Sequence, residues 1–189
     1  MILVVRTLLA MLAAGMIALA TLGADSAPES AGRPGGTDVA ILPTPHIHLG
    51  ERHAPYDSVP PTSGPHHPDT VGTGVYREEL REEIQVHVLE HGHVLVQYAP
   101  QLGAAEVREL ERLGRRYPRD VVVAPYRRLA SLARRGRPIA LTAWARIDRL
   151  ASADERRISA FVRAYGGRYD HGEWRGADRP ASRRLGRPR

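Results

Sequence analysis

The fold is decided by residues 84–99, which read IQVHVLEHGHVLVQYA. Valine, isoleucine, leucine and tyrosine dominate this stretch, and Gly92 lies near its middle. β-Branched and aromatic residues favour strands, and a glycine inside such a run is typical of a turn or a bulge. We therefore predict two short strands, at about 84–89 and 93–98, that meet around Glu90–Gly92.

The segments that follow carry signals for two helices and two further strands. GAAEVRELERLGRRYP, residues 103–118, and SADERRISAFVRAYGG, residues 152–167, both have apolar side chains at helical spacing. Ser152 is the expected N-cap of the second helix, and a glycine pair is expected to end it. Continuous apolar runs predict strands at about 120–124 and 138–146.

The predicted order β-β-α-β-β-α is typical of an α+β domain, here a small sheet of about four strands with two helices on one face. This single domain would occupy residues 45–167, after a flexible linker rich in proline, glycine and serine at 25–44. The domain begins with a long irregular segment, residues 45–76, that is rich in proline, glycine and histidine. Long ordered loops are usually functional, so this segment is a candidate for the site.

The two ends of the chain differ from this domain in composition. An uncharged apolar run follows Arg6, so residues 1–24 are expected to form a cleaved signal peptide or an N-terminal membrane anchor. The protein would then be exported, either secreted or held in the cell envelope, with membrane contact through this segment. Residues 168–189 hold seven arginines, three acidic residues and few apolar ones, which predicts a disordered tail.

Charge and cysteine content limit the partners and the metal ligands to be expected for this chain. All 27 basic residues are arginine, and most of the net charge of +6 lies in the tail. The remainder of the chain is close to neutral, so nucleic acid is not an expected partner. The chain has no cysteine, which excludes disulfides, thiolate ligands and a cysteine nucleophile. A transition metal would have to be bound through histidine and carboxylate.

The histidines are strongly clustered along the chain. Eight of the nine fall within a window that covers about a quarter of the sequence, at His46, His48, His53, His66, His67, His87, His91 and His93. Neutral imidazole is the commonest protein metal ligand. Any one of these side chains is readily explained as a surface or hydrogen-bonding group, but the set favours one shared polar site.

The string His87-x-x-Glu90-His91 matches the H-x-x-E-H motif of inverse zinc proteases. On a helix, this spacing would place both histidines on one face as zinc ligands, with Glu90 as the base. The surrounding valines and Gly92 favour a strand followed by a turn instead. On a strand the two histidines share a face and Glu90 lies opposite, unless a bulge at Gly92 changes the alternation.

Residues 60–67, PPTSGPHH, form the second chemically distinctive string. Three prolines restrict the backbone, and Gly64 permits a bend. We interpret the string as a rigid turn that presents His66, with the hydroxyls of Thr62 and Ser63 holding the turn together. A nucleophilic role for Ser63 is disfavoured, because the strand–turn–helix context of a nucleophile elbow is absent.

Taken together, PPTSGPH at 60–66 and HVLEHG at 87–92 resemble the domain-of-unknown-function 3105 family. The LTAW segment at 141–144 and the helix after it are also similar, so the resemblance spans about residues 45–165. The resemblance implies an exported protein or one with a single N-terminal membrane segment, and it supplies no activity, substrate or cofactor. The positions that match histidines of the family are His48, His66, His87 and His91.

The leading hypothesis is an exported protein that binds a divalent transition metal, zinc or copper, through some of His48, His66, His87 and His91. The first alternative is a hydrolase that uses the same histidines with Glu90 as general acid and base. The second is a cell-envelope interaction module whose histidines only hydrogen-bond the long loop to the sheet. The sequence assigns neither a substrate nor a protein partner.

Overall fold

A computed structural model of the chain describes residues 35–169. The expected signal peptide or anchor at 1–24 lies outside these residues, as do the first part of the expected linker and nearly all of the Arg-rich tail. None of the helices within residues 35–169 has the length and apolarity needed to cross a membrane.

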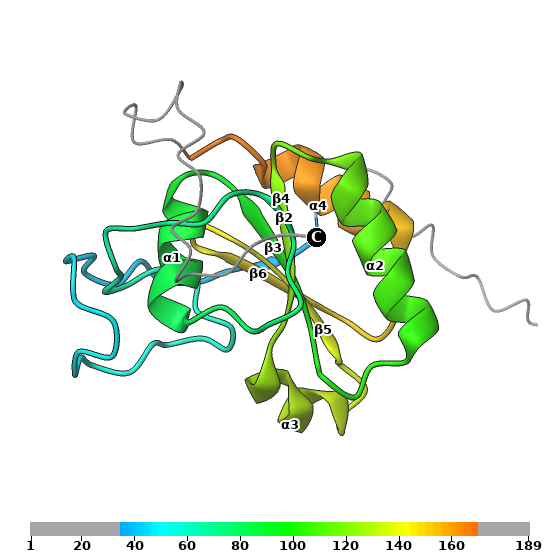
Figure 1. Ribbon diagram of the computed structural model, residues 1–189, viewed down its shortest axis with the longest axis horizontal. Helices are drawn as coiled ribbons and strands as arrows, with labels where there is room; N and C mark the ends of the chain where they lie inside the picture. Colours follow the sequence, from blue (N-terminus) through cyan, green and yellow to red (C-terminus); the bar gives the residue numbers. More distant parts are fainter. Residues whose placement is uncertain (1–34, 170–189) are drawn as a thin grey trace, which may run out of the picture. The chain divides into compact units, whose positions relative to one another are not determined.

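A mixed six-stranded sheet forms the centre of the described part (Figure 1). The strands are β1 Thr37–Asp38, β2 Gly74–Val75, β3 Val94–Tyr98, β4 Val121–Pro125, β5 Ile139–Ala143 and β6 Arg146–Leu150. Their order across the sheet is β1-β6-β5-β3-β4-β2, in which β3 pairs in parallel with β4 and antiparallel with β5. The predicted α+β class is confirmed, with two short edge strands and β6 in addition to three of the four expected strands. β1 lies within the segment expected to be a linker.

The helices lie on both faces of this sheet. They are α1 Glu82–Glu90, α2 Ala104–Arg116, the short α3 Ala130–Ala133 with a preceding 3-10 turn at Arg127–Leu129, and α4 Glu155–Tyr165. Side chains of α2 and α4 pack on one face in a single apolar cluster, and α1 packs on the other (Figure 1). Both helices predicted downstream of residue 100 are therefore confirmed, on one face as expected.

The predicted strand at 84–89 is wrong, because these residues belong to α1. Residues 83–90 are all buried, so the helix has no exposed face and its sequence has no amphipathic stripe. β-Branched residues cost a helix only some tenths of a kcal/mol each, about 0.7 at most. Burial of Val86 and Val88 on a helix surrounded by protein outweighs this cost.

Gly92 ends this helix and does not form a turn between two strands. Its φ is +77°, a left-handed conformation that glycine adopts without strain. Its backbone N–H donates to the Leu89 carbonyl at 2.9 Å, and that of His93 donates to the Val88 carbonyl at 3.3 Å. These two bonds are those of a Schellman cap. The helix therefore stops immediately before β3, and the predicted strand at 93–98 is confirmed as β3.

Two further boundaries differ from the sequence-based expectation. The predicted strand at 138–146 is a hairpin, in which β5 turns into β6 through Ala145 with a φ of 56°. The N-cap of α4 is Asp154, which accepts a hydrogen bond from the Arg157 backbone N–H, and not Ser152. Both differences concern where an element starts or ends, and neither changes the architecture.

Candidate functional site

The PPTSGPHH loop is an ordered and largely buried part of the fold. Residues 60–64 are buried, and Ser63 is fully inaccessible. Its hydroxyl donates to the Ala40 carbonyl at 3.2 Å and accepts from the Leu42 backbone N–H at 3.0 Å. Ser63 therefore joins the loop to the preceding segment of chain, which is a structural role and leaves no exposed nucleophile.

Gly64 and Tyr56 fix the direction in which the loop leaves this anchor. Gly64 has a φ of +122°, and a Cβ there would lie 3.0 Å from the Tyr56 ring. The Tyr56 hydroxyl donates to the Pro65 carbonyl at 2.6 Å. Burial, followed by the charges of Glu83 and Glu82, raises the pKa of Tyr56, so it remains a hydrogen-bond donor at all ordinary pH values.

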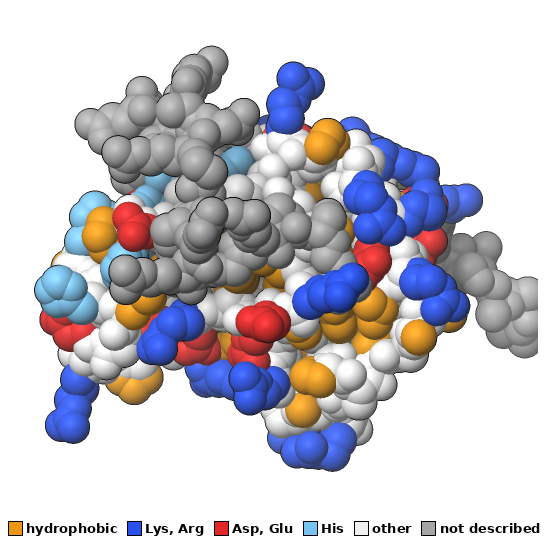
Figure 2. All heavy atoms as spheres, viewed as in Figure 1, with side chains coloured by type: hydrophobic (Ala, Val, Ile, Leu, Met, Phe, Trp, Pro, Cys, Tyr) orange, Lys and Arg blue, Asp and Glu red, His pale blue; other side chains and the backbone are white. Residues whose placement is uncertain are grey.

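Backbone pairing then brings three chain segments together. His46 and His66 form an isolated parallel bridge. The Ile47 N–H donates to the His66 carbonyl at 2.8 Å, and the His66 N–H donates to the Pro45 carbonyl at 3.1 Å. The His67 N–H donates to the Glu83 carbonyl in the first turn of α1 at 3.2 Å. Histidines gather at the end of the molecule formed by α1 and this loop (Figure 2).

The two buried imidazoles of this region have the same hydrogen-bond arrangement. His66 Nδ1 lies 2.9 Å from the Gly64 carbonyl oxygen, and His87 Nδ1 lies 2.5 Å from the His67 carbonyl oxygen. A carbonyl oxygen can only accept, so each Nδ1 carries the hydrogen. In the neutral ring, each Nε2 is then left with a lone pair. Metal-binding histidines are commonly oriented in this way.

Three imidazoles, including these two, and one carboxylate lie close together. His46, His66, His87 and Glu90 each offer one ligand atom, and these atoms all lie within 4.8 Å of one another. His66 Nε2 is 2.7 Å from Glu90 Oε2. Because His66 has its hydrogen on Nδ1, two lone pairs face each other across this contact unless a proton or another cation lies between them. The group could hold a metal ion.

Burial of the group is uneven. His66, His87 and Glu90 are buried, whereas His46 is exposed. The group is thus enclosed on the side of α1 and open to solvent on the side of His46. A carboxylate in such a setting favours a nearby positive charge, because burial makes an uncompensated charge costly.

The same burial keeps His87 in the form that binds metals. Burial is the main cause of the lowered pKa of His87, which falls to about 4. The charges of His91 and His66 lower this pKa further, whereas the hydrogen bond to the His67 carbonyl raises it. The imidazole is therefore neutral at physiological pH. Neutral imidazole, not imidazolium, is the metal-binding species.

His91 lies directly beside this group. Its Nε2 is 2.6 Å from His87 Nε2, and the two rings stack with centroids 4.6 Å apart. Since the hydrogen of neutral His87 is on Nδ1, the hydrogen of this contact comes from His91. His91 thus contacts the group through His87.

The structure brings together three of the four histidines that the sequence analysis named. His66 and His87 belong to the group, and His91 touches it. His48 lies outside the group; it is exposed, and its backbone N–H bonds the Glu51 carboxylate at 2.8 Å. His46 and Glu90 were not named as ligands. A helical reading of H-x-x-E-H would have placed Glu90 one turn from His87, and His46 was named only as one of the eight clustered histidines.

These features define the class of the protein: an α+β fold, over residues 35–169, in which a buried proline-rich loop and a buried helix bring together a histidine–glutamate group. The chain belongs to the DUF3105 family, described as protein of unknown function, and a model of this family matches residues 46–180. The resemblance carried by the PPTSGPH and HVLEHG strings is thus confirmed. Comparisons with curated proteins and with solved structures give no match.

Proposed function

We propose that this chain binds a divalent transition metal, zinc or copper, through His46, His66, His87 and Glu90. The observation that carries the proposal is the matched orientation of His66 and His87. Each has its Nδ1 hydrogen on a backbone carbonyl, which leaves the Nε2 lone pair for another partner, and both belong with Glu90 to the group whose ligand atoms lie within 4.8 Å of one another. At His66 that lone pair faces Glu90 at 2.7 Å, and at His87 a bound ion would take the place of the hydrogen from His91.

The donor set supports zinc or copper over harder ions. Imidazole nitrogen suits zinc and copper, whereas magnesium and calcium prefer oxygen ligands. Three imidazoles and one carboxylate also make up the four ligands of a closed tetrahedral zinc site. The cysteine-free sequence leaves no thiolate to compete for the ion.

Export is part of the same proposal. It rests on the uncharged apolar segment after Arg6. Cell fractionation with mass spectrometry of the N-terminus tests it: processing near residues 20–24, or recovery with membranes, is expected. An unprocessed chain in the cytoplasmic fraction would contradict this part alone.

Calorimetric titration and elemental analysis of the purified chain test the metal site. We expect one ion per chain, with affinity falling at least about tenfold in His66→Ala and His87→Ala, because loss of even an indirect ligand contact costs about 10–100-fold. His53→Ala is the matched control, since His53 hydrogen-bonds only the Ala54 carbonyl outside the group.

His48→Ala separates the two ligand sets. If the metal is held as the structure suggests, this variant binds as tightly as the unaltered chain. Loss of binding in His48→Ala with retention in His66→Ala would contradict the proposed ligands. Absence of any stoichiometric ion in the unaltered chain would remove the proposal altogether.

A second candidate, metal-dependent hydrolysis, is favoured by one observation: the string that matches the H-x-x-E-H motif lies on a helix and its C-terminal cap, and not on a strand. Glu90→Gln distinguishes the two roles of this carboxylate. If Glu90 acts as a base, the variant retains the ion and loses turnover of peptide or ester substrates. If Glu90 is a ligand, the variant loses the ion itself.

A further inference from the structure

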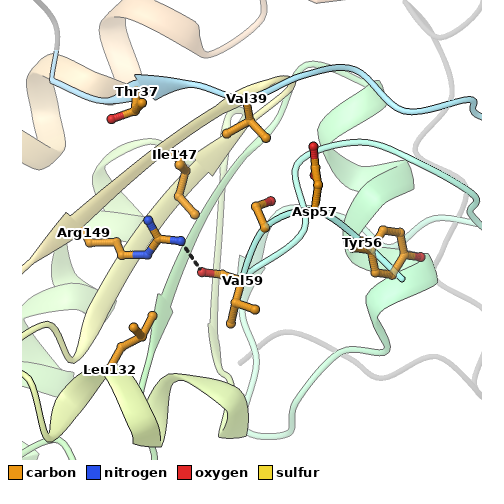
Figure 3. Close-up of a pocket in the computed structure, with 9 residues that line it drawn as sticks. Thr37, Val39, Tyr56, Asp57, Val59, Leu132, Ile147 and Arg149 are labelled. Carbon is orange, nitrogen blue, oxygen red and sulfur yellow. Dashed lines mark hydrogen bonds between the residues drawn. The ribbon is translucent and has the colours of Figure 1, made fainter. Parts of the chain in front are cut away.

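A second concave site lies at the β1–β6 edge of the sheet, apart from the histidine–glutamate group. It is an open groove of about 420 Å³ between β6, the loop at 56–59 and α3 (Figure 3). This volume falls within the range of small-molecule sites, about 300–1,000 Å³. None of the proposed metal ligands lines it.

Arg149 is the charged group of this groove. Its Nη2 donates to the Val59 carbonyl at 2.9 Å (Figure 3), and its Nε is buried without a hydrogen-bond partner among the described residues. The neighbouring carboxylate of Asp148 is engaged by Arg157 through two bonds of 2.7 and 2.8 Å. Within residues 35–169, Arg149 therefore has no carboxylate partner.

The surroundings disfavour the charged form of this guanidinium. Burial, followed by the charge of Arg137, lowers the pKa of Arg149, while Asp148 acts in the opposite direction. Arg137 also donates to the Arg149 carbonyl at 3.0 Å, so a second cation lies close by. A partly buried charge without a counter-ion is costly, and a bound carboxylate would remove that cost.

The rest of the groove is mainly apolar. Val39, Val59, Leu132 and Ile147 supply hydrocarbon surface beside the guanidinium. Figure 3 shows Asp57 at the end of the groove away from Arg149, so its charge does not neutralise the arginine. A phosphate group would find one guanidinium and several aliphatic walls, which suits it less well than a singly charged carboxylate.

We propose that this groove binds a small carboxylate with a short apolar chain. The carboxylate pairs with the guanidinium of Arg149 through Nη1, because Nη2 donates to Val59 and Nε is buried. The hydrocarbon chain lies against the aliphatic side chains of β6 and the 56–59 loop. This proposal does not depend on metal binding by the histidine–glutamate group.

Titration of the full chain with hexanoate, in the presence of a chelator that removes metal ions, tests the proposal. Isothermal calorimetry or chemical-shift changes should give saturable binding. Hexanol and hexylammonium, which share the chain and lack the carboxylate, should bind at least about tenfold more weakly, since a charge-assisted hydrogen bond is worth a factor of this order. No saturable hexanoate binding, or equal binding of all three, overturns the proposal.

Three variants locate the site. Arg149→Gln should weaken hexanoate binding at least about tenfold, whereas Arg134→Gln, which removes the same charge from an exposed position outside the groove, should not. Should Arg149→Gln fail to fold, Val39→Trp decides, because it fills the groove and leaves the charge in place. Undiminished binding in Val39→Trp, or in a folded Arg149→Gln, overturns the proposal.

Discussion

Single residues determine how the long loop and α1 meet. Glu83, in the first turn of α1, accepts from the Gly50 backbone N–H at 2.9 Å and from Arg81 at 3.2 Å. The carboxylate is nearly inaccessible, whereas Arg81 is 56% exposed, so the bond to Gly50 is expected to carry most of the stabilisation. One buried carboxylate thus holds the loop that follows His48 against the helix.

Glu83 should make the stability of the fold sensitive to acid. Burial alone would raise the pKa of Glu83, but the hydrogen bonds from Arg81 and from backbone N–H groups outweigh it and hold the pKa below the ordinary value of 4.5. The folded state therefore binds this proton more weakly than the unfolded chain does. The stabilisation is present above about pH 4.5 and is lost as the pH falls through the lowered pKa.

We accordingly expect Glu83→Gln to lower the free energy of unfolding at pH 7 by about 1 kcal/mol and to flatten its decline below pH 4.5. Urea unfolding at a series of pH values measures both effects. Glu78→Gln, an equal charge change on an exposed side chain, is the control. Parallel pH curves for Glu83→Gln and the unaltered chain would contradict the assignment.

At the scale of elements, α1 and α2 were not equally predictable. α2 has apolar residues on one face and charged residues on the other, and it was placed from the sequence. α1 is buried on every side, so its composition resembles that of a buried strand. Apolar side chains recur at helical spacing when one face of a helix contacts protein and the other contacts water. A helix that is surrounded by protein therefore lacks this pattern.

Gly114 shows how closely α2 packs on the sheet. This glycine lies inside the helix, which continues to Arg116. A Cβ at this position would lie 2.4 Å from Cγ2 of Val123 in β4. The glycine thus permits a close helix–strand approach within the main apolar cluster.

Replacement of Gly114 by alanine should therefore destabilise the fold by about 1–3 kcal/mol, as expected for overpacking, even though alanine favours helix by about 1 kcal/mol. Chemical unfolding measures the change. Gly72→Ala, where a Cβ would meet nothing within 4 Å, is the matched control. Adding Val123→Ala should recover part of the loss; stabilisation by Gly114→Ala alone would contradict the close contact.

At the scale of the whole molecule, the site depends on contacts that local sequence does not encode. The PPTSGPHH string predicted that His66 would be presented by a turn, and the loop is buried and tied down by the hydrogen bonds of Ser63 and Tyr56. The bridge between His46 and His66 joins residues far apart in the chain, and no periodic pattern specifies it. The position of Glu90 relative to His87 depended on whether α1 was a helix, so the error in one element carried over into the site.

Metal binding should appear as a change in global stability. If the ion binds only the folded chain, a free metal concentration of 100 times Kd adds about 2.7 kcal/mol, or roughly 5–10 °C in Tm for a chain of this size. Calorimetric melting with zinc and then with excess chelator measures the shift and its reversal. His66→Ala should lose the shift and His53→Ala should keep it; an equal shift in both would point to nonspecific binding.

The pairing of His46 with His66 also determines which parts of the folded chain a bound ion would join. The proposed ligands divide the chain into two spans of roughly twenty residues, between His46 and His66 and between His66 and His87. An ion that joined all three would close two loops in the folded chain. A disulfide persists in the unfolded chain, whereas such an ion leaves on unfolding, so its binding free energy adds directly to the stability of the folded state. In this chain without cysteine, a bound ion would be a reversible cross-link between the long irregular segment and the buried helix α1.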